Sequence, residues 1–312
     1  MIHDVSLKQL TYVEAAGRLG SIARASESLA ISQSSITAAI DGLETRLGFD
    51  LFTRVPARGI RPTPAGVEAL ALIARFLDQA AAFRAELGSV GGVATGVVRV
   101  ACFASAAANF LPALLRAFAA EFPSVDVRLV EGDMDEAIDH IRGGRADLAF
   151  TYEEVVGAGA EFAPLVDAPA YALLPLSDPL AGRRTLALSE LEGRPMIALS
   201  LARTRDYYTD LFRRVGLAPN VVHASSSVEM IRTLVAAGLG FTLLNARPPG
   251  YVQDDARFRA VPLRGEVPAR RFGMATPSGT RPPKAVAAFR QTVAEMHAAG
   301  GFEHLAVRSP KN

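Results

Sequence analysis

The 312-residue chain lacks several features that mark other classes of protein. Cys102 is its only cysteine, so an intrachain disulfide is impossible and a cysteine-based metal cluster is not expected. No apolar run approaches the length of a membrane span, and the N-terminal stretch MIHDVSLKQLTYVEAAG does not place a basic segment before an apolar one. We therefore expect a soluble, cytoplasmic protein that has no contact with a membrane.

Sequence signatures of common enzyme sites are also missing. The five histidines are scattered, with no pair at the HExxH spacing of a metal site, and neither a GxSxG elbow nor a Walker phosphate loop occurs. We therefore expect no catalytic residue, no metal and no cofactor. An enzyme is the competing class because α/β domains can also be catalytic, and a turnover assay on a bound ligand would separate the two.

A helix-turn-helix pattern lies between Ser21 and Leu47. Apolar residues recur there at the spacing of one buried helix face, at Ile22, Ala25 and Leu29 and then at Ile36, Ile40, Leu43 and Leu47. The break between the two helices is short, and Ser32 is a suitable N-cap for the second helix. A second helix that packs by one face leaves its polar, hydroxyl-rich face for a DNA groove. Because the net charge is only +1, affinity for DNA must come from the placement of charges and from more than one copy of the domain.

The segment after the helix-turn-helix is basic and rich in turn residues. It carries Arg54, Arg58 and Arg61 and has no acid after Asp50 until the next helix. We interpret it as a two-stranded wing whose basic tip lies on phosphates. The alternative is a solvated loop with ordinary surface arginines.

A long alanine-rich helix follows, with Thr63 as its cap and Pro64 at its first position. One face of it steps by three and four through Val67, Leu70, Ala74, Leu77, Ala81 and Arg84, and we expect this face to pack against its twin in a dimer. The glycines of GSVGGVATG predict a hinge. The domains that we predict are a winged helix-turn-helix (1–63), a dimerising linker helix (64–87), a hinge (88–96) and an effector-binding domain (97–302).

From Val97 onward short apolar strands alternate with amphipathic helices, which indicates an α/β fold. We predict strands at Val97–Cys102, Val125–Val130, Asp147–Thr151, Tyr171–Leu174, Met196–Leu199, Val221–His223, Gly240–Leu244 and Phe272–Ala275. We predict helices at Phe110–Phe122, Asp135–Arg142, Arg205–Val215, Val228–Ala237 and Lys284–Ala298. A polar segment around Val166–Pro169 divides this part into two lobes, the first about 97–166 with 273–302 and the second about 167–272.

The chain resembles the LysR-type transcriptional regulators over essentially its full length. The resemblance is carried by LKQLTYVEAAGRLGSIARASESLAISQSSITAAIDGLETRLGFDLFTR, RGIRPTPAG, LPALLRAFAAEFPSVDVRLVEG with GGRADLAF, and VAAGLGFTLL. It implies an α/β protein overall, with an N-terminal all-α winged helix-turn-helix, a linker helix and a two-lobed α/β effector domain that resembles periplasmic binding proteins. It also implies a homotetramer that grips bent promoter DNA, responds to a small molecule between the lobes, and has RNA polymerase as a further partner.

The second helix of the motif departs from the family pattern. Relatives often carry a Pro after the Gln of SQ and an Arg midway along this helix, and this chain has neither. Without that Arg, base reading would depend on Gln33, Ser34, Ser35 and Thr37, and Gln33 suits an adenine edge. The complete set of predicted DNA contacts is Arg24, Ser32, Gln33, Ser34, Ser35, Thr37, Arg54, Arg58 and Arg61.

An effector site is expected at strand ends that face helix N-termini, whose free N–H groups favour anions. The predicted effector residues are Ala104, Ser105, Met134, Thr151, Ser200, Arg203, Ser226 and Asn245. The serines have a plainer explanation as helix caps, whereas an Arg in a first helical turn opposes the helix dipole, which favours a ligand role for Arg203. Met134 cannot anchor a carboxylate. We hypothesise that Ser105 and the Ser200/Arg203 loop hold a small organic anion, with aromatic acids among the candidates.

Redox sensing is an alternative function. Cys102 lies at the end of the first predicted strand near the expected pocket, but the chain has no second cysteine to resolve an oxidised thiol. We therefore interpret Cys102 as a small buried hydrophobic residue. A peroxide response that Cys102→Ser abolishes would reverse this interpretation.

Overall fold

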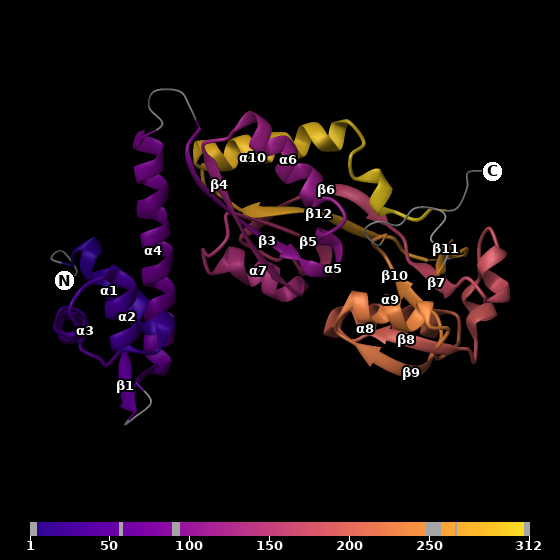
Figure 1. The fold of residues 1–312 in the computed structure, drawn as a ribbon, viewed down its shortest axis with the longest axis horizontal. Coiled ribbons are helices and arrows are strands. Elements are labelled where there is room, and N and C mark those ends of the chain that lie inside the picture. The colour runs from indigo at the N-terminus through magenta and orange to yellow at the C-terminus, as the bar shows by residue number, and fades with distance from the viewer. Residues whose placement is uncertain (1–4, 56–58, 89–93, 248–256, 266, 309–312) are drawn as a thin grey trace. The chain divides into compact units, whose positions relative to one another are not determined.

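The computed structural model describes residues 5–55, 59–88, 94–247, 257–265 and 267–308 (Figure 1). The chain divides into two compact units, residues 1–93 with 143–145 and residues 94–142 with 146–312. Among the described residues, none of the helices is both long enough and apolar enough to cross a membrane.

The N-terminal unit combines helices with an antiparallel hairpin. Its elements are α1 (Leu7–Leu19), α2 (Ile22–Leu29), α3 (Gln33–Leu47), β1 (Phe52–Val55), β2 (Gly59–Pro62) and α4 (Pro64–Gly88). The helix-turn-helix, the wing hairpin and the long helix after Thr63 are thereby confirmed. Ser6 caps α1 in a reciprocal capping box with Gln9, and Ser32 caps α3 by accepting from the Ser35 N–H at 3.2 Å.

The turn between α2 and α3 is short because one residue takes a left-handed conformation. Ala30 has φ of 51°, and the N–H of Ile31 donates back to the carbonyl of Ser26 at 3.1 Å. This turn brings the apolar faces of the helices together, so that Ala16 and Ala25 bury against Ile36. The predicted apolar spacing therefore describes the core of this unit.

Helix α4 uses its apolar residues in two ways. Ile73 is buried, and Leu70 and Leu77 are partly buried, against the helix-turn-helix core. These two leucines belong to the face that we expected to meet a twin helix, so that expectation is corrected for them: they pack within their own unit. The exposed apolar residues that lie close together around the helix are instead Leu72, Phe76 and Phe83.

The first lobe of the C-terminal unit is built on a five-stranded sheet with strand order β4–β3–β5–β12–β6. Its strands are β3 (Gly96–Phe103), β4 (Val125–Gly132), β5 (Leu148–Tyr152), β6 (Ala160–Ala168) and β12 (Arg270–Pro277). Strand β3 pairs in parallel with β4 and β5, whereas β12 pairs antiparallel with β5 and β6. The helices of this lobe are α5 (Ala104–Ala107), α6 (Leu111–Glu121), α7 (Met134–Arg142) and α10 (Lys284–Ala298). Helices α6 and α10 lie on one side of the sheet and α7 on the other (Figure 1).

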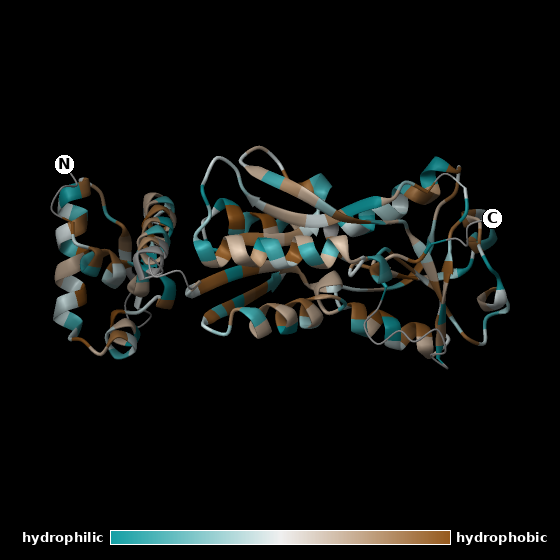
Figure 2. Ribbon diagram, turned by 90° about the horizontal axis from the view of Figure 1, so that it is seen from above, coloured by the Kyte–Doolittle hydropathy of each residue, from teal (hydrophilic) through white to brown (hydrophobic). Residues whose placement is uncertain are grey.

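The second lobe holds two smaller sheets. Strand β7 (Tyr171–Pro175) lies between β10 (Thr242–Leu244) and β11 (Phe258–Pro262), both antiparallel to it, while β8 (Pro195–Leu199) and β9 (Asn220–Ser225) pair in parallel. A bridge between Met196 and Phe241 connects the two sheets. The helices are α8 (Ala202–Arg214) and α9 (Val228–Ala236). Helices along the chain mix hydrophobic and hydrophilic residues, as expected where one face packs on a neighbouring element (Figure 2).

The strands and helices predicted from Val97 onward are present, within a few residues of their predicted ends. Two further strands were not predicted. One is β11. The other is β6, which ends at Ala168, so the segment that we interpreted as a polar divider is partly a strand with Val166 buried. The predicted lobe boundaries at 166 and 273 fall inside β6 and β12, and the chain passes between the lobes after Ala168 and before Arg270.

Candidate functional sites

Helix α3 presents two chemically different faces. Ile36, Ile40 and Leu43 are buried, whereas Gln33 and the serines beside it are exposed. The hydroxyl of Ser32 lies 2.9 Å from that of Ser34 and 2.8 Å from that of Ser35, so the cap and the exposed serines form one cluster. Thr37 is half-buried, and its hydroxyl donates to the Gln33 carbonyl at 3.0 Å.

The wing begins on a carboxylate of α3. Oε1 of Glu44 accepts from the N–H of Leu51 at 2.7 Å and from the N–H of Phe52 at 3.0 Å. This contact fixes the start of β1 against α3, and sequence reasoning missed it because Glu44 reads as an ordinary charged residue of a helix. At the other end of the hairpin, the Thr63 hydroxyl donates to the Asp50 carbonyl at 2.7 Å and accepts from the Gly66 N–H at 2.9 Å.

The predicted DNA contacts differ in how well the structure places them. Arg24 is exposed on α2, and Arg61 is exposed on β2. The backbone of Arg54 lies in β1, but its side chain and all of Arg58 are outside the described residues. The placed members of the set therefore lie on α2, on the N-terminal part of α3 and on the wing.

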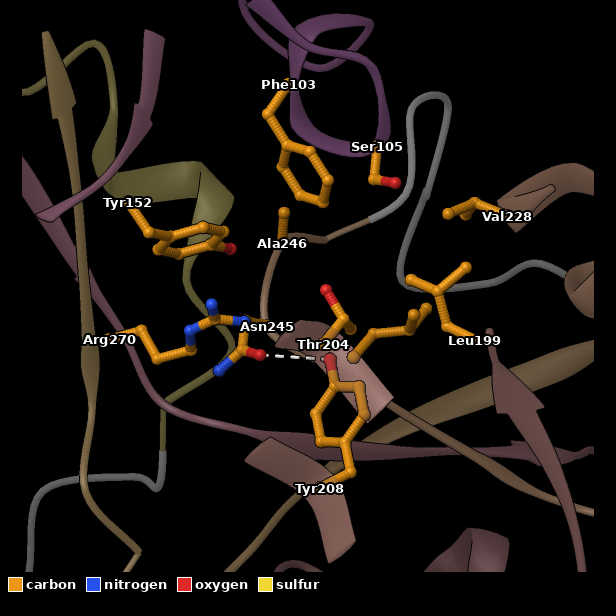
Figure 3. Close-up of a pocket in the computed structure, with 11 residues that line it drawn as sticks. Phe103, Ser105, Tyr152, Leu199, Thr204, Tyr208, Val228, Asn245, Ala246 and Arg270 are labelled. Carbon is orange, nitrogen blue, oxygen red and sulfur yellow. Dashed lines mark hydrogen bonds between the residues drawn. The ribbon is translucent and has the colours of Figure 1, made fainter. Parts of the chain in front are cut away.

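A pocket of about 350 Å³, which includes space open to solvent, lies between the two lobes (Figure 3). From the first lobe, Phe103 and Tyr152 stand at the ends of β3 and β5, and Ser105 lies on α5 directly after β3. Arg270 stands at the start of β12. The second lobe contributes residues from β8, α8, α9 and the end of β10, which are Leu199, Thr204, Tyr208, Val228, Leu244, Asn245 and Ala246. Its position at strand ends is typical of ligand sites in α/β folds.

Arg270 is a buried cation in the wall of this pocket, with 5% of its surface exposed. Its guanidinium lies 4.2 Å from the ring centre of Tyr152 and 4.7 Å from that of Tyr207, and it forms an ion pair with Glu154. Burial disfavours the charge, but Tyr152 and Glu154 hold the pKa of Arg270 above its ordinary value. The residue therefore stays charged where the two lobes meet.

Asn245 organises the floor of the pocket. Its Oδ1 accepts from the Tyr208 hydroxyl at 2.9 Å, and its Nδ2 donates to the Ala168 carbonyl at 2.8 Å. Burial raises the pKa of Tyr208 well above its ordinary value, so this hydroxyl remains a donor. Thr204, only 2% exposed, lies beside this group, and its Oγ1 has no hydrogen-bond partner among the described residues.

The predicted effector residues are dispersed in the structure. Ser105 and Asn245 line the pocket. Met134 lies outside the lining, buried against Arg270, with its Sδ 3.0 Å from the guanidinium. Arg203 points to a carboxylate instead: its Nε lies 2.8 and 2.7 Å from the two oxygens of Asp135, and this hydrogen bond raises the pKa of Arg203.

The other predicted effector residues also lie off the described lining. Thr151 is buried within β5. Alternate side chains of a strand point to opposite faces, so Thr151 points away from the pocket that its neighbour Tyr152 lines. Ala104, Ser200 and Ser226 are exposed. No local pattern indicated Arg270, which stands far along the chain from the other first-lobe residues and resembles an ordinary basic residue before a strand.

Cys102 is completely buried in the core of the first lobe, with its Sγ 3.7 Å from the Val130 carbonyl. Burial raises its pKa to about 11. In the part of the chain that the structure describes, no group of three or more His, Cys, Asp or Glu side chains could hold a metal ion.

Comparisons with known proteins agree with this architecture. Residues 7–67 match the family described as "Bacterial regulatory helix-turn-helix protein, lysR family", and residues 91–298 match "LysR substrate binding domain". The chain is 31% identical to the transcriptional regulator CbbR of Xanthobacter flavus over 83% of its own length and 78% of the relative's.

Solved structures give the same result. HinK, a LysR family transcriptional regulator from Pseudomonas aeruginosa, is 32% identical with a TM-score of 0.60, and the match covers 94% of this chain and 99% of that chain. CbnR in complex with its target DNA has the same fold, with a TM-score of 0.68 at 23% identity over 93% of this chain and 99% of that chain. The chain therefore belongs to the LysR family of DNA-binding transcriptional regulators and carries an effector-binding domain.

Proposed function

We propose that α3 and the β1–β2 wing bind promoter DNA and that a small molecule in the pocket between the lobes controls this binding. The observation that carries the proposal is the division of α3 into a buried apolar face and an exposed polar N-terminal end. In helix-turn-helix proteins this end of the second helix contacts base edges. Gln33, Ser34 and Ser35 occupy it here, with Ser32 as the cap, Thr37 one turn further along, and Arg24 and the wing arginines toward phosphates.

The test begins with a duplex that the full-length protein selects from a random pool. Gln33→Ala is expected to weaken binding to the selected duplex about tenfold or more, because a bidentate contact with a base contributes about 1–3 kcal/mol of discrimination. Its affinity for random DNA should stay unchanged. Gln291→Ala, an exposed glutamine on α10, is the matched control. Equal affinity of wild type and Gln33→Ala for the selected duplex would contradict base reading by α3.

We further propose that α4 mediates self-association and that the working form is a tetramer. Leu72, Phe76 and Phe83 are 59%, 51% and 63% exposed on one side of this helix. Large apolar residues grouped on a helix surface are typical of contacts between subunits. A second copy of the same helix is the occupant that we propose, because two DNA-binding units held together would give the affinity that a net charge of +1 cannot.

Sedimentation of the full-length chain tests this part. Phe76→Glu is expected to lower the molecular mass in solution, because it places a charge in the apolar contact. The control is again Gln291→Ala. Asp78→Asn, a substitution on α4 itself, would not be a suitable control, because Asp78 has contacts of its own. A Phe76→Glu protein that sediments like wild type would exclude α4 as the contact.

The pocket is the proposed effector site, since its lining comes from both lobes and a ligand there would change how they close on each other. A regulator of this type would act on promoters in the cytoplasm and alter the recruitment of RNA polymerase. A ligand that changes the affinity of the protein for its selected duplex, and loses this effect when the pocket is altered, is the expected result.

A further inference from the structure

The wing is attached to the rest of the N-terminal unit on both of its strands. On β1 the attachment is the Glu44 carboxylate, which accepts from the N–H groups of Leu51 and Phe52. On β2 it is a backbone hydrogen bond, in which the Ile60 N–H donates to the Gly20 carbonyl at 3.1 Å. In a two-stranded hairpin every second N–H of a strand points away from the partner strand. This bond therefore fastens the outer edge of β2 to the turn between α1 and α2.

Two glycines make this close approach of backbone to backbone possible. Gly20 follows the end of α1 with φ of 63°, and Gly59 begins β2 with φ of 87°. A Cβ on Gly59 would lie 2.4 Å from the carbonyl oxygen of Gly20. Since that oxygen belongs to the backbone, it cannot turn aside as the end of a side chain would. Any residue larger than glycine at this position must therefore displace the wing from the turn.

The contact lies between two parts of the proposed DNA-binding surface. Ser21, which follows Gly20, caps α2 by accepting from the Arg24 N–H at 3.3 Å, and Arg24 is exposed. Along β2 the side chains alternate, so that Ile60 is 6% exposed in the core of the unit and Arg61 faces outward. The backbone contact thus joins the segment that carries Arg24 to the strand that carries Arg61.

We infer that Gly59 is a positioning residue for DNA binding: it lets β2 dock on the α1–α2 turn at the distance that places Arg61 on a phosphate while α3 reads the bases. The inference rests on the proposed function and deepens it, because it makes the phosphate contact depend on a backbone approach as well as on charge. Phosphate contacts carry no sequence information directly. Gly59 should therefore set the affinity for every duplex and not the preference among them.

Anisotropy titration of full-length Gly59→Ala with the selected duplex and with random DNA, between about 50 and 200 mM salt, tests the inference. The slope of log affinity against log salt is expected to fall by about 0.9 or more, the value of one phosphate contact. The ratio of the affinities for the two kinds of DNA should stay as in wild type, whereas Gln33→Ala lowers this ratio. An unchanged slope for Gly59→Ala would overturn the inference.

Gly48→Ala is the matched control for backbone strain. Gly48 has φ of 77°, and among the described residues no atom beyond its own chain neighbours lies within 4 Å of the position that its Cβ would take. The substitution therefore brings a left-handed alanine into the same unit without displacing a neighbour, so it should lower the Tm and leave the salt slope unchanged. If it reduces the slope as much as Gly59→Ala does, stability governs the slope and the inference is wrong.

A double variant shows whether Gly59 acts through Arg61. Gly59→Ala/Arg61→Ala is expected to have the slope of Gly59→Ala alone, because the displaced wing has already lost that phosphate contact. Additive losses from the two substitutions would overturn the inference. Gly59→Asn keeps the steric clash with less backbone strain, since Asn adopts positive φ more readily than Ala, and it replaces Gly59→Ala in every titration if that protein does not fold.

The same titrations distinguish a failure of the inference from a failure of the proposed function. A wild-type protein whose affinity falls steeply with salt, together with a Gly59 variant of unchanged slope, would defeat only the role of Gly59. A wild-type protein that selects no duplex, or whose affinity does not depend on salt, would count against the proposed function itself.

Discussion

Glu44 gives the sharpest prediction for the N-terminal unit, because a single carboxylate oxygen accepts two backbone N–H groups. Its Oε1 lies 2.7 Å from the Leu51 nitrogen and 3.0 Å from the Phe52 nitrogen. Leu51 is fully buried, so Glu44→Ala would leave its N–H without a partner away from water. Hydrogen bonds to a charged group contribute about 1.5–3 kcal/mol each and are not additive, so we expect a loss of about 3 kcal/mol of unfolding free energy.

Thermal unfolding of the N-terminal unit within the full-length protein measures this loss. About 3 kcal/mol corresponds to a fall in Tm of about 10 °C or more for a unit of this size. Glu44→Gln keeps an acceptor oxygen without the charge and should lose only about 1 kcal/mol. Glu27→Ala, at an exposed position on α2, should change the unfolding free energy by less than about 0.5 kcal/mol. If Glu44→Ala unfolds at the temperature of Glu27→Ala, the carboxylate does not hold the wing to α3.

Five further outcomes follow from the structure. Arg61→Ala should reduce the slope of log affinity for DNA against log salt by about 0.9, the value of one phosphate contact, and an unchanged slope in anisotropy titrations would contradict that contact. Because burial raises the pKa of Cys102 to about 11 from 9.0, its thiolate fraction at pH 8 should be about 100-fold below that of a free thiol, so iodoacetamide should label it far more slowly than the unfolded chain. The neutral buried thiol stabilises the fold fully below pH 9 and loses this contribution as the pH rises toward 11, which a pH series of urea unfolding of wild type and Cys102→Ala would detect. Asp135→Asn should lower the unfolding free energy, measured in urea, by less than about 1 kcal/mol, since both partners of its ion pair are about half exposed. In the same assay Phe118→Ala should lower it by about 3–5 kcal/mol, because the substitution removes a fully buried ring 4.8 Å from that of Phe289.

The sequence predicted the elements whose residues repeat at a regular period. Helix α3 is buried on one side, which gives the apolar spacing from Ile36 to Leu43, and β5 is buried completely, which gives a continuous apolar run. Both patterns can be recognised within the segment itself. Strand β6 escaped prediction because it lies at the edge of the sheet, carries Pro164 and alternates irregularly between exposed and buried residues. Its role depends on β12, a partner more than a hundred residues away.

The pocket could be located from the sequence more easily than its chemistry. Strand ends and helix starts indicated Ser105 and Asn245 as neighbours, and the structure places both on one pocket. The contribution of Arg270 depends on its distance to Tyr152 and Tyr207, which no local pattern encodes. Likewise Arg203 was predicted to bind a ligand on account of the helix dipole, but Asp135 on α7 is close enough in space to pair with it.

The most direct test of the central claim is a selection of random duplexes by the full-length protein, followed by anisotropy titration of the selected duplex between 50 and 200 mM salt. The account predicts an enriched sequence motif and an affinity that falls steeply with salt, since base edges are read by α3 and phosphates are held by the arginines around it. No enriched motif, or an affinity that does not change with salt, would contradict the assignment of α3 and the wing as the DNA-binding surface.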